Sequence, residues 1–313
     1  MSINFINTSN INSGIENDIN KFVAESERIY TDRLREAAEK IYTDRAYRPL
    51  VLLSGPSGSG KTTSALKIAE QLAKKGLTVH TISMDNYFLP AGMGDLPVDE
   101  DGQVDLESPY RLDIPLFSEH LKKLFRCEPV EIPVFDFATQ SRSDFIPMHR
   151  KKDEIIILEG IHALNLDVTG DTDAFTTCIY VSVRTRLRTD DGIVMHPRKI
   201  RLMRRLSRDC LFRNRKPEDV FNMYNSVTRG EEKYIMPHKY RANFDIDSFI
   251  AYEASVYSKL LLPTLIKNKE KLEHIDDYDT MIKVLSSLTP LSPEHVPSDS
   301  LVREFVGGSS LQY

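Results

Sequence analysis

The chain has 313 residues, of which 41% are hydrophobic and 28% are charged, and its net charge is −5 at pH 7. This composition is typical of a globular protein with one large domain or two small ones. The negative charge argues against nucleic acid as a partner. No apolar run reaches the ~20 residues that a membrane span needs. The first 14 residues lack the basic and apolar regions of a secretory signal.

The remaining composition points to the cytoplasm. The three cysteines are far apart in the sequence and lack the spacing of a metal site. We therefore expect reduced thiols in a cytoplasmic protein.

The N-terminal 45 residues precede the main domain. Residues 1–14 are polar and rich in Asn and Ser, which predicts a poorly ordered arm. From Gly14 to about Arg45 apolar residues recur at helical spacing and predict an amphipathic helix, packed on the domain or on a partner subunit. A membrane-surface helix is disfavoured because its acidic and basic residues are balanced. We divide the chain into this segment (1–45), a main domain (46–265) and a C-terminal helical region with a tail (266–313).

Residues 51–63 read VLLSGPSGSGKTT and contain the P-loop pattern Gly55-x-x-x-x-Gly60-Lys61-Thr62. A short apolar strand precedes it and a helix ending near Gly76 follows, which is the context that this motif requires. Lys61 can reach the β- and γ-phosphates of a nucleotide, and the Thr62 hydroxyl can hold Mg²⁺. We expect ATP and Mg²⁺ as cofactors, with the nucleotide on Gly55, Ser57, Gly58, Ser59, Gly60, Lys61, Thr62 and Thr63.

Strands and helices alternate after the P-loop. The apolar pattern predicts strands at Leu50–Ser54, Thr78–Met84, Ile155–Leu158 and Cys178–Val183, with helices at 62–75, 115–126 and 198–213. Near-continuous apolar runs indicate strands that are buried on both faces, as in parallel sheets. The fold class expected is therefore α/β, a P-loop NTPase fold with a parallel sheet flanked by helices. Residues 90–110, rich in Gly, Pro and Asp, predict a long loop.

Two acidic residues follow predicted strands. Asp85 stands where it can accept the proton of an attacking hydroxyl, although it can equally cap a turn. Glu159 closes a buried strand beside the P-loop, the usual place of a carboxylate on the Mg²⁺ side. An ion pair between Glu159 and a core arginine is the alternative.

Arginines are dense on the helix predicted at 198–213. Positions 201, 204, 205 and 208 share a face and can neutralise a triphosphate, so we expect an arginine-rich lid. A solvated basic face and nucleic-acid binding are the alternatives, and the lack of interleaved aromatics weighs against the latter. The segment Phe135–Arg142, which follows a strand predicted at Val130–Val134, combines aromatics, an amide and an arginine that can contact a base, or it is an ordinary loop.

Together these segments resemble the uridine kinase/phosphoribulokinase family of P-loop kinases, and look closest to its bacterial nucleoside-kinase-like branch. The resemblance covers roughly residues 46–265, and the tail beginning at Arg303 also looks like that branch. The blocks that carry it are Gly55–Thr62, Met84–Phe88, Phe135–Arg142, Leu158–Asn165, Arg201–Asn214 and Ser226–Lys233.

The resemblance implies roles for individual residues. Asp85 corresponds to the general base, Glu159 with Thr62 to the Mg²⁺ site, and Glu107 to the acid that grips the ribose hydroxyls. Gln140 stands where uridine kinases carry a His that reads the pyrimidine, and Phe135 replaces their usual Tyr. The catalytic residues expected are Lys61, Asp85, Arg204 and Arg208. The substrate-binding residues expected are Tyr87, Glu107, Phe135, Phe137, Gln140, Arg142 and Arg201.

We therefore expect an ATP- and Mg²⁺-dependent kinase, with a small-molecule substrate and a homo-oligomeric assembly. Its acceptor would be a sugar hydroxyl, first of all the 5′-OH of a nucleoside. The alternatives are a kinase of a non-nucleoside sugar phosphate or small metabolite, and a nucleotide-binding regulator with little turnover.

Overall fold

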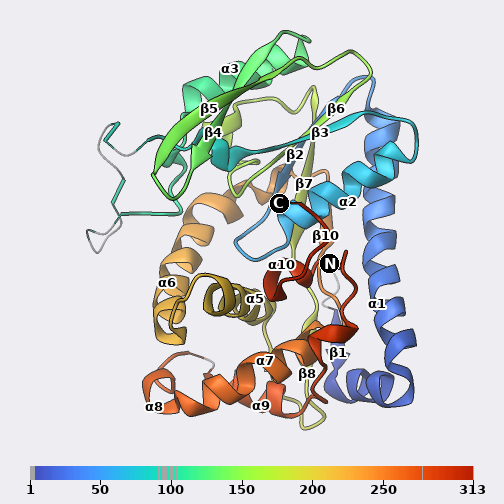
Figure 1. The fold of residues 1–313 in the computed structure, drawn as a ribbon. Coiled ribbons are helices and arrows are strands. Elements are labelled where there is room, and N and C mark those ends of the chain that lie inside the picture. The colour runs from blue at the N-terminus through green and yellow to red at the C-terminus, as the bar shows by residue number, and fades with distance from the viewer. Residues whose placement is uncertain are drawn as a thin grey trace.

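The computed structural model describes residues 4–90, 92–93, 97–98, 102, 104–276 and 278–312. At its centre lies a parallel sheet of five strands in the order β10-β7-β2-β6-β3 (Figure 1). The strands are β2 (Leu50–Ser54), β3 (Val79–Ser83), β6 (Ile155–Glu159), β7 (Thr176–Ser182) and β10 (Phe244–Asp247). Every residue of β2, β6 and β7 is buried, which explains their apolar sequences. The predicted parallel sheet is confirmed.

Alternate side chains of β2 build two separate cores, as the pleat of a strand requires. Val51 and Leu53 belong to the larger core, which contains α2 (Lys61–Ala73) and the long N-terminal helix α1 (Thr8–Asp44). Leu50 and Leu52 belong to the smaller core on the opposite face, with α3 (Ile114–Phe125). Helices therefore cover both faces of the sheet (Figure 1).

A β-hairpin stands outside the parallel sheet. β4 (Val130–Asp136) pairs in antiparallel fashion with β5 (Ser141–Met148). The strand expected at 130–134 therefore exists, but it forms a separate ribbon whose buried residues, such as Ile132, pack into the smaller core. The tight turn between the strands places Gln140 at φ +51°, an uncommon backbone conformation for a residue other than glycine.

The expectation of a poorly ordered N-terminal arm is wrong for residues 4–14. β1 (Phe5–Asn7) pairs with β8 (Arg186–Arg188), which also pairs with β9 (Val194–Met195). Helix α1 begins directly afterwards, at Thr8, with one non-helical residue at Asp18. The polar side chains that suggested disorder have fixed partners, since Asn12 bonds to the backbone of Ser287 and Thr289. Residues 1–3 lie outside the described residues.

The second half of the chain is largely helical (Figure 1). α5 (Pro197–Phe212) and α6 (Pro217–Gly230) precede a π-helical turn η3 (Glu231–Ile235) and a 3₁₀ segment η4 (Met236–Arg241). After β10 come α7 (Glu253–Lys267), α8 (Lys269–Leu272), α9 (Tyr278–Ser286), η5 (Pro293–His295) and α10 (Arg303–Val306). The shorter elements are α4 (Leu166–Thr169), η1 (Met84–Tyr87) and η2 (Pro109–Arg111). Among the described helices, none is long and apolar enough to cross a membrane.

The tail holds the helix of the P-loop. The Thr63 hydroxyl donates to the Glu304 carboxylate at 2.6 Å, and Lys67 forms an ion pair with Asp299 at 2.8 Å. Leu301 is fully buried against Gly60, where a Cβ atom would lie 2.4 Å from its Cδ1. Segments from both ends of the chain thus clasp α2, because α1 approaches it through a hydrogen bond between Tyr30 and Ser64 at 2.8 Å.

Leu301→Ala tests how firmly the tail is packed. We expect the free energy of unfolding to fall by ~2–5 kcal/mol, because a buried leucine leaves a cavity when it is truncated. Urea denaturation measures the loss, with Leu211→Ala as the control, since Leu211 is 51% exposed and should cost under about 0.5 kcal/mol. Equal losses in the two variants would contradict the packing.

Candidate active site

The P-loop links β2 to α2 in a tight path that depends on glycine. Gly58 and Gly60 have φ values of +74° and +80°. A Cβ atom on Gly55 would lie 2.0 Å from the carbonyl oxygen of Val181, so the close passage of β7 excludes any side chain there. Gly60 precedes α2 without a side-chain cap. The first N–H groups of α2 therefore have no capping side chain, and a helix N-terminus of this kind attracts phosphate.

Lys61 stands among three carboxylates. Its ammonium lowers the pKa of Asp85, Glu107 and Glu159, while burial raises each pKa more strongly. The pKa rises to about 7 for both Glu107 and Glu159. Asp85 additionally raises the pKa of the other two carboxyls by like-charge repulsion. The protein thus gathers more negative charge here than its one lysine neutralises.

Thr62 and Glu159 form a pair suited to Mg²⁺. The Thr62 hydroxyl lies 3.3 Å from Oε1 of Glu159, which ends β6 and is 7% exposed. Among the described residues no cluster of three His, Cys, Asp or Glu side chains stands ready for a metal. Mg²⁺ commonly takes only one or two protein carboxylates and completes its shell with water and phosphate. One hydroxyl and one carboxylate with a raised pKa therefore fit this ion.

Asp85 lies in the 3₁₀ turn η1, directly after β3. Ser83 caps that turn, since its hydroxyl accepts from the N–H of Asp85 at 3.3 Å. The capping role considered for Asp85 thus belongs to Ser83. Within the described residues the Asp85 carboxylate accepts no hydrogen bond. Its side chain reaches solvent, yet the surrounding protein displaces enough water to raise its pKa. These are properties of a carboxylate that can accept a proton.

Glu107 is held in a narrow site. It is 8% exposed, and its Oε2 has no hydrogen-bond partner. A Cβ atom on Gly230 would lie 2.3 Å from Cβ of Glu107, so the end of α6 approaches closely only because it is glycine. Arg205 provides the largest opposing charge. A buried acceptor without a partner is costly, which favours a ligand hydroxyl at this place. Parts of the long loop expected at 90–110 lie outside the described residues.

Helix α5 lies against the P-loop, but its arginines have different roles. Arg204 is fully buried, pairs with the equally buried Glu253 at 2.8 Å, and donates to the carbonyl of Gly58 at 3.1 Å. Arg201 is also buried, pairs with Glu231 at 2.7 Å, and donates to the carbonyl of Ser57. These contacts favour a structural role for both residues over the catalytic role expected of Arg204 and the substrate contact expected of Arg201. Both guanidinium groups are already committed to buried acids and to the P-loop backbone.

A second group of arginines surrounds Asp209, which is completely buried. Four guanidinium groups lie within 3.1–3.6 Å of its carboxylate, those of Arg205, Arg208, Arg213 and Arg215. Sequence reasoning missed Asp209, although it is the one acid between positions 198 and 215. Arg208, Arg213 and Arg215 have side chains that are 22–49% exposed, so this group remains accessible to a phosphate.

The base-contacting residues expected from the sequence are only partly brought together. Tyr87 is a correction, because its side chain is fully buried and its hydroxyl bonds to His120 at 3.0 Å. Arg142 pairs with Asp113 at 2.9 Å and supports the backbone of Tyr87, so it too is a scaffold residue.

The hairpin side chains have other positions. Phe135 is buried and Phe137 is 56% exposed, and both pack edge-to-face on Phe88. Gln140 lies exposed in the hairpin turn and donates to the carbonyl of Phe137 at 2.8 Å. Sequence reasoning missed Arg111, whose guanidinium lies 4.8 Å from the centre of the Phe88 ring. Its charge also lowers the pKa of Asp85, and nothing in the local pattern marks it.

Comparisons with known proteins agree with this geometry. A family model described as "Phosphoribulokinase / Uridine kinase family" matches residues 50–252. Uridine kinases from Staphylococcus aureus strains JH9 and Newman are each 33% identical over 198 residues, which is 63% of this chain and 86% of theirs.

Solved structures are more distant. A possible uridine kinase from Bacillus stearothermophilus matches 69% of this chain and 98% of its own, with a TM-score of 0.47 and 17% identity. A putative fructose transport system kinase from Silicibacter sp. TM1040 has a TM-score of 0.45 and 18% identity over 68% of this chain and 98% of its own. Because the family model matches residues 50–252 and the chain covers 86% of relatives that are 33% identical to it, the chain belongs to the phosphoribulokinase/uridine kinase family of kinases.

Proposed function

We propose that the protein uses ATP and Mg²⁺ to phosphorylate a hydroxyl of a small molecule, first of all the 5′-OH of a nucleoside. The observation that carries this proposal is the set of three carboxylates around Lys61, directly beside the P-loop. The kinship with proteins named uridine kinase supports a nucleoside acceptor. A nucleotide-binding regulator would not need both a proton acceptor and an Mg²⁺-side acid, so we favour an enzyme.

Each carboxylate has its own task in this proposal. Asp85 accepts the proton of the acceptor hydroxyl as that oxygen attacks the γ-phosphorus. Thr62 and Glu159 would hold Mg²⁺, which supplies positive charge to the phosphates. Glu107 accepts hydrogen bonds from sugar hydroxyls through the oxygen that lacks a partner. Asp85 and Glu159 lie at the ends of β3 and β6, and Glu107 is held against the end of α6, so the three groups reach the substrate already oriented.

We assign the lid function to the arginines around Asp209 and not to the whole arginine-rich helix. Arg205 donates to Oγ of Ser57 in the P-loop at 3.2 Å, and Asp209 aligns it with Arg208, Arg213 and Arg215. These guanidinium groups can stabilise the charge that develops on the transferred phosphoryl group. Because Arg208, Arg213 and Arg215 are partly exposed, they can close over the nucleotide and exclude water, which would otherwise hydrolyse it.

The identity of the acceptor depends on the exposed part of the hairpin. Gln140 uses one N–H of its NH₂ group on the Phe137 carbonyl, so its carbonyl oxygen and the second N–H are left to bond a base. The ring of Phe137, on the same turn, packs edge-to-face on Phe88. The donor and acceptor of an amide differ in reach from those of a histidine ring. We therefore propose that a nucleoside other than uridine is preferred, and a non-nucleoside sugar is the second candidate.

The test of this function is ADP release over a panel of uridine, cytidine, adenosine, guanosine, inosine and free sugars. We expect a nucleoside to lead in kcat/KM, and uridine not to lead by tenfold. Asp85→Asn should lower kcat by roughly 10²–10⁴, the worth of a positioned base, while Asp144→Asn in the exposed hairpin serves as the control. Activity of Asp85→Asn within threefold of wild type would refute the role of Asp85. If no member of the panel supports ADP release, the kinase proposal is refuted.

Glu107→Gln should separate stability from function. A pKa raised to about 7 means that the folded state holds this proton more tightly than the unfolded chain. The contribution of Glu107 to stability therefore falls as pH rises from ~4.5 to ~7. The variant should gain up to ~3 kcal/mol over wild type at pH 8, with the gain vanishing near pH 4. Its kcat/KM should nevertheless fall about tenfold or more, because a charged acceptor is lost. Urea denaturation across pH measures the gain, and Glu131→Gln, on an exposed residue, should show none.

Arg204→Ala and Arg208→Ala form a matched pair on one helix. Removing Arg204 leaves Glu253 buried without its partner, which we expect to cost ~3–5 kcal/mol of stability. Removing Arg208 should change stability by under ~1 kcal/mol but lower kcat by roughly 10². Thermal denaturation and steady-state kinetics distinguish them. An active, destabilised Arg208→Ala, or a stable, inactive Arg204→Ala, would reverse the assignment.

A further inference from the structure

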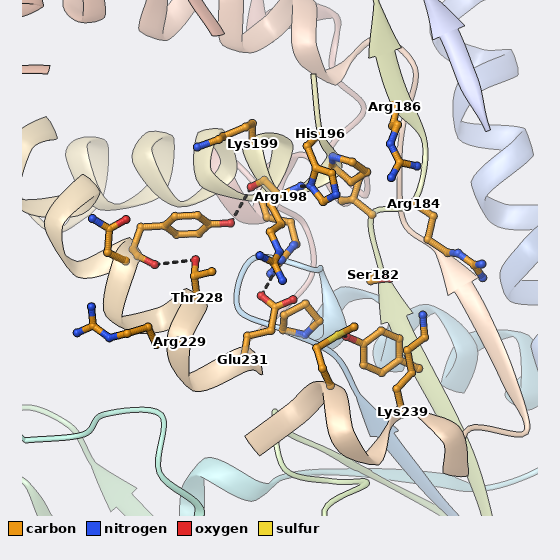
Figure 2. Close-up of a pocket in the computed structure, with 18 of the residues that line it drawn as sticks. Ser182, Arg184, Arg186, His196, Arg198, Lys199, Thr228, Arg229, Glu231 and Lys239 are labelled. Carbon is orange, nitrogen blue, oxygen red and sulfur yellow. Dashed lines mark hydrogen bonds and ion pairs between the residues drawn. The ribbon is translucent and has the colours of Figure 1, made fainter. Parts of the chain in front are cut away.

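A second cavity, of about 930 Å³, opens beside the P-loop between β7, α5, α6 and η4 (Figure 2). Among the described residues its lining includes Pro56 of the P-loop but none of the carboxylates around Lys61. Its volume lies within the range of cavities that hold a small ligand. The proposed function assigns nothing to it.

The lining of this cavity is strongly basic. Among the described residues that line it are seven Arg and Lys side chains and His196, with Glu231 and Asp276 as the acids. The chain as a whole has a net charge of −5, so the positive charge of this cavity is a local feature that the overall composition does not explain. Besides Arg201, six cations line the cavity, and they come from four short stretches between positions 184 and 239: Arg184 and Arg186, Arg198 and Lys199, Arg229, and Lys239.

The inner wall is fixed. Arg201 is 3% exposed, and both it and its ion-pair partner Glu231 line the cavity. The same guanidinium donates to the Ser57 carbonyl at 3.2 Å, so this wall is continuous with the P-loop. The hydroxyl of Tyr224 donates to the carbonyl of Arg198 at 2.7 Å and holds the first turn of α5 in place.

At the rim, the four cations Arg184, Arg186, Arg198 and Lys239 face two carboxylates among the described residues. Arg198 pairs with Glu232 at 2.8 Å. Arg184 and Lys239 share the carboxylate of Asp245, at 2.7 and 3.8 Å. Arg186 forms no ion pair or side-chain hydrogen bond within the described residues. Positive groups held close together repel one another, and a bound anion relieves that repulsion.

We propose that this cavity is a second anion site, which binds a small molecule with two or more phosphate groups and is separate from the nucleotide site on the P-loop. One guanidinium group can bind two oxygens of a phosphate at once. The cavity therefore holds more cations than a single phosphate group can contact. Nucleic acid fits less well, because the aromatic side chains of the lining, Tyr180 and Tyr224, are buried and offer no face for stacking.

Calorimetric titration with inorganic pyrophosphate, without Mg²⁺, tests the proposal on the full chain. We expect two sites per chain in wild type and one in Lys61→Ala, which weakens the P-loop. Adding Arg186→Gln and Lys239→Gln to Lys61→Ala should weaken the remaining site at least tenfold. The matched control adds Lys152→Gln and Lys267→Gln, which remove the same charge from exposed positions outside the cavity.

Either of two results would overturn the proposal: one site in wild type that Lys61→Ala abolishes, or equal weakening by the cavity and control pairs. If the combined variant does not fold, Arg186→Gln alone in the Lys61→Ala background is measured against Lys152→Gln alone. Loss of the P-loop site with retention of the cavity site would support the second site even if the protein phosphorylates nothing.

Discussion

Three carboxylates share one ammonium group at the heart of this molecule. Asp85 and Glu159 follow from the pairing of β3 with β6, Glu107 comes from the loop before η2, and all three feel the charge of Lys61. Burial raises the pKa of each carboxyl, so their charged forms are unfavourable in the protein alone. A divalent cation and the hydroxyl groups of a substrate would complete a site that the protein by itself leaves short of positive charge.

Three buried acids determine which arginines on and just after α5 support the structure and which remain available to a ligand. Glu231 fixes Arg201 and Glu253 fixes Arg204, and both arginines then support carbonyl groups of the P-loop. Asp209 instead collects arginines at the partly exposed end of the helix. One helix thereby joins the phosphate loop to the core and presents a cluster of cations to solvent. The division is made by the acids, since the arginines themselves are chemically identical.

The limits of sequence reasoning follow from the same contacts. The P-loop and the buried strands were predictable because glycine spacing and apolar runs are local signals. Helical spacing also placed Arg201, Arg204 and Arg208 on a common side of α5, but it could not show what faces that side. The partner of Arg204 lies 49 positions away, in a different helix. Tyr87 was expected to bind the substrate because it belongs to the same block, Met84–Phe88, as Asp85. Side chains of one 3₁₀ turn point in different directions, and that of Tyr87 is buried against His120. The strand at 130–136 was found, but its pattern does not distinguish a hairpin from a member of the parallel sheet.

The bond between Thr63 and Glu304 joins residues that are 241 positions apart. During synthesis the phosphate loop and its helix leave the ribosome long before the segment that covers them exists. Until residues 299–306 are made, Lys67 lacks the carboxylate of Asp299, and the apolar surface beside Gly60 lacks Leu301. A nascent chain can therefore form the sheet early, while the nucleotide-binding end stays open to water and to chaperones. The maturation of this site is therefore tied to translation of the tail, which supplies these contacts last.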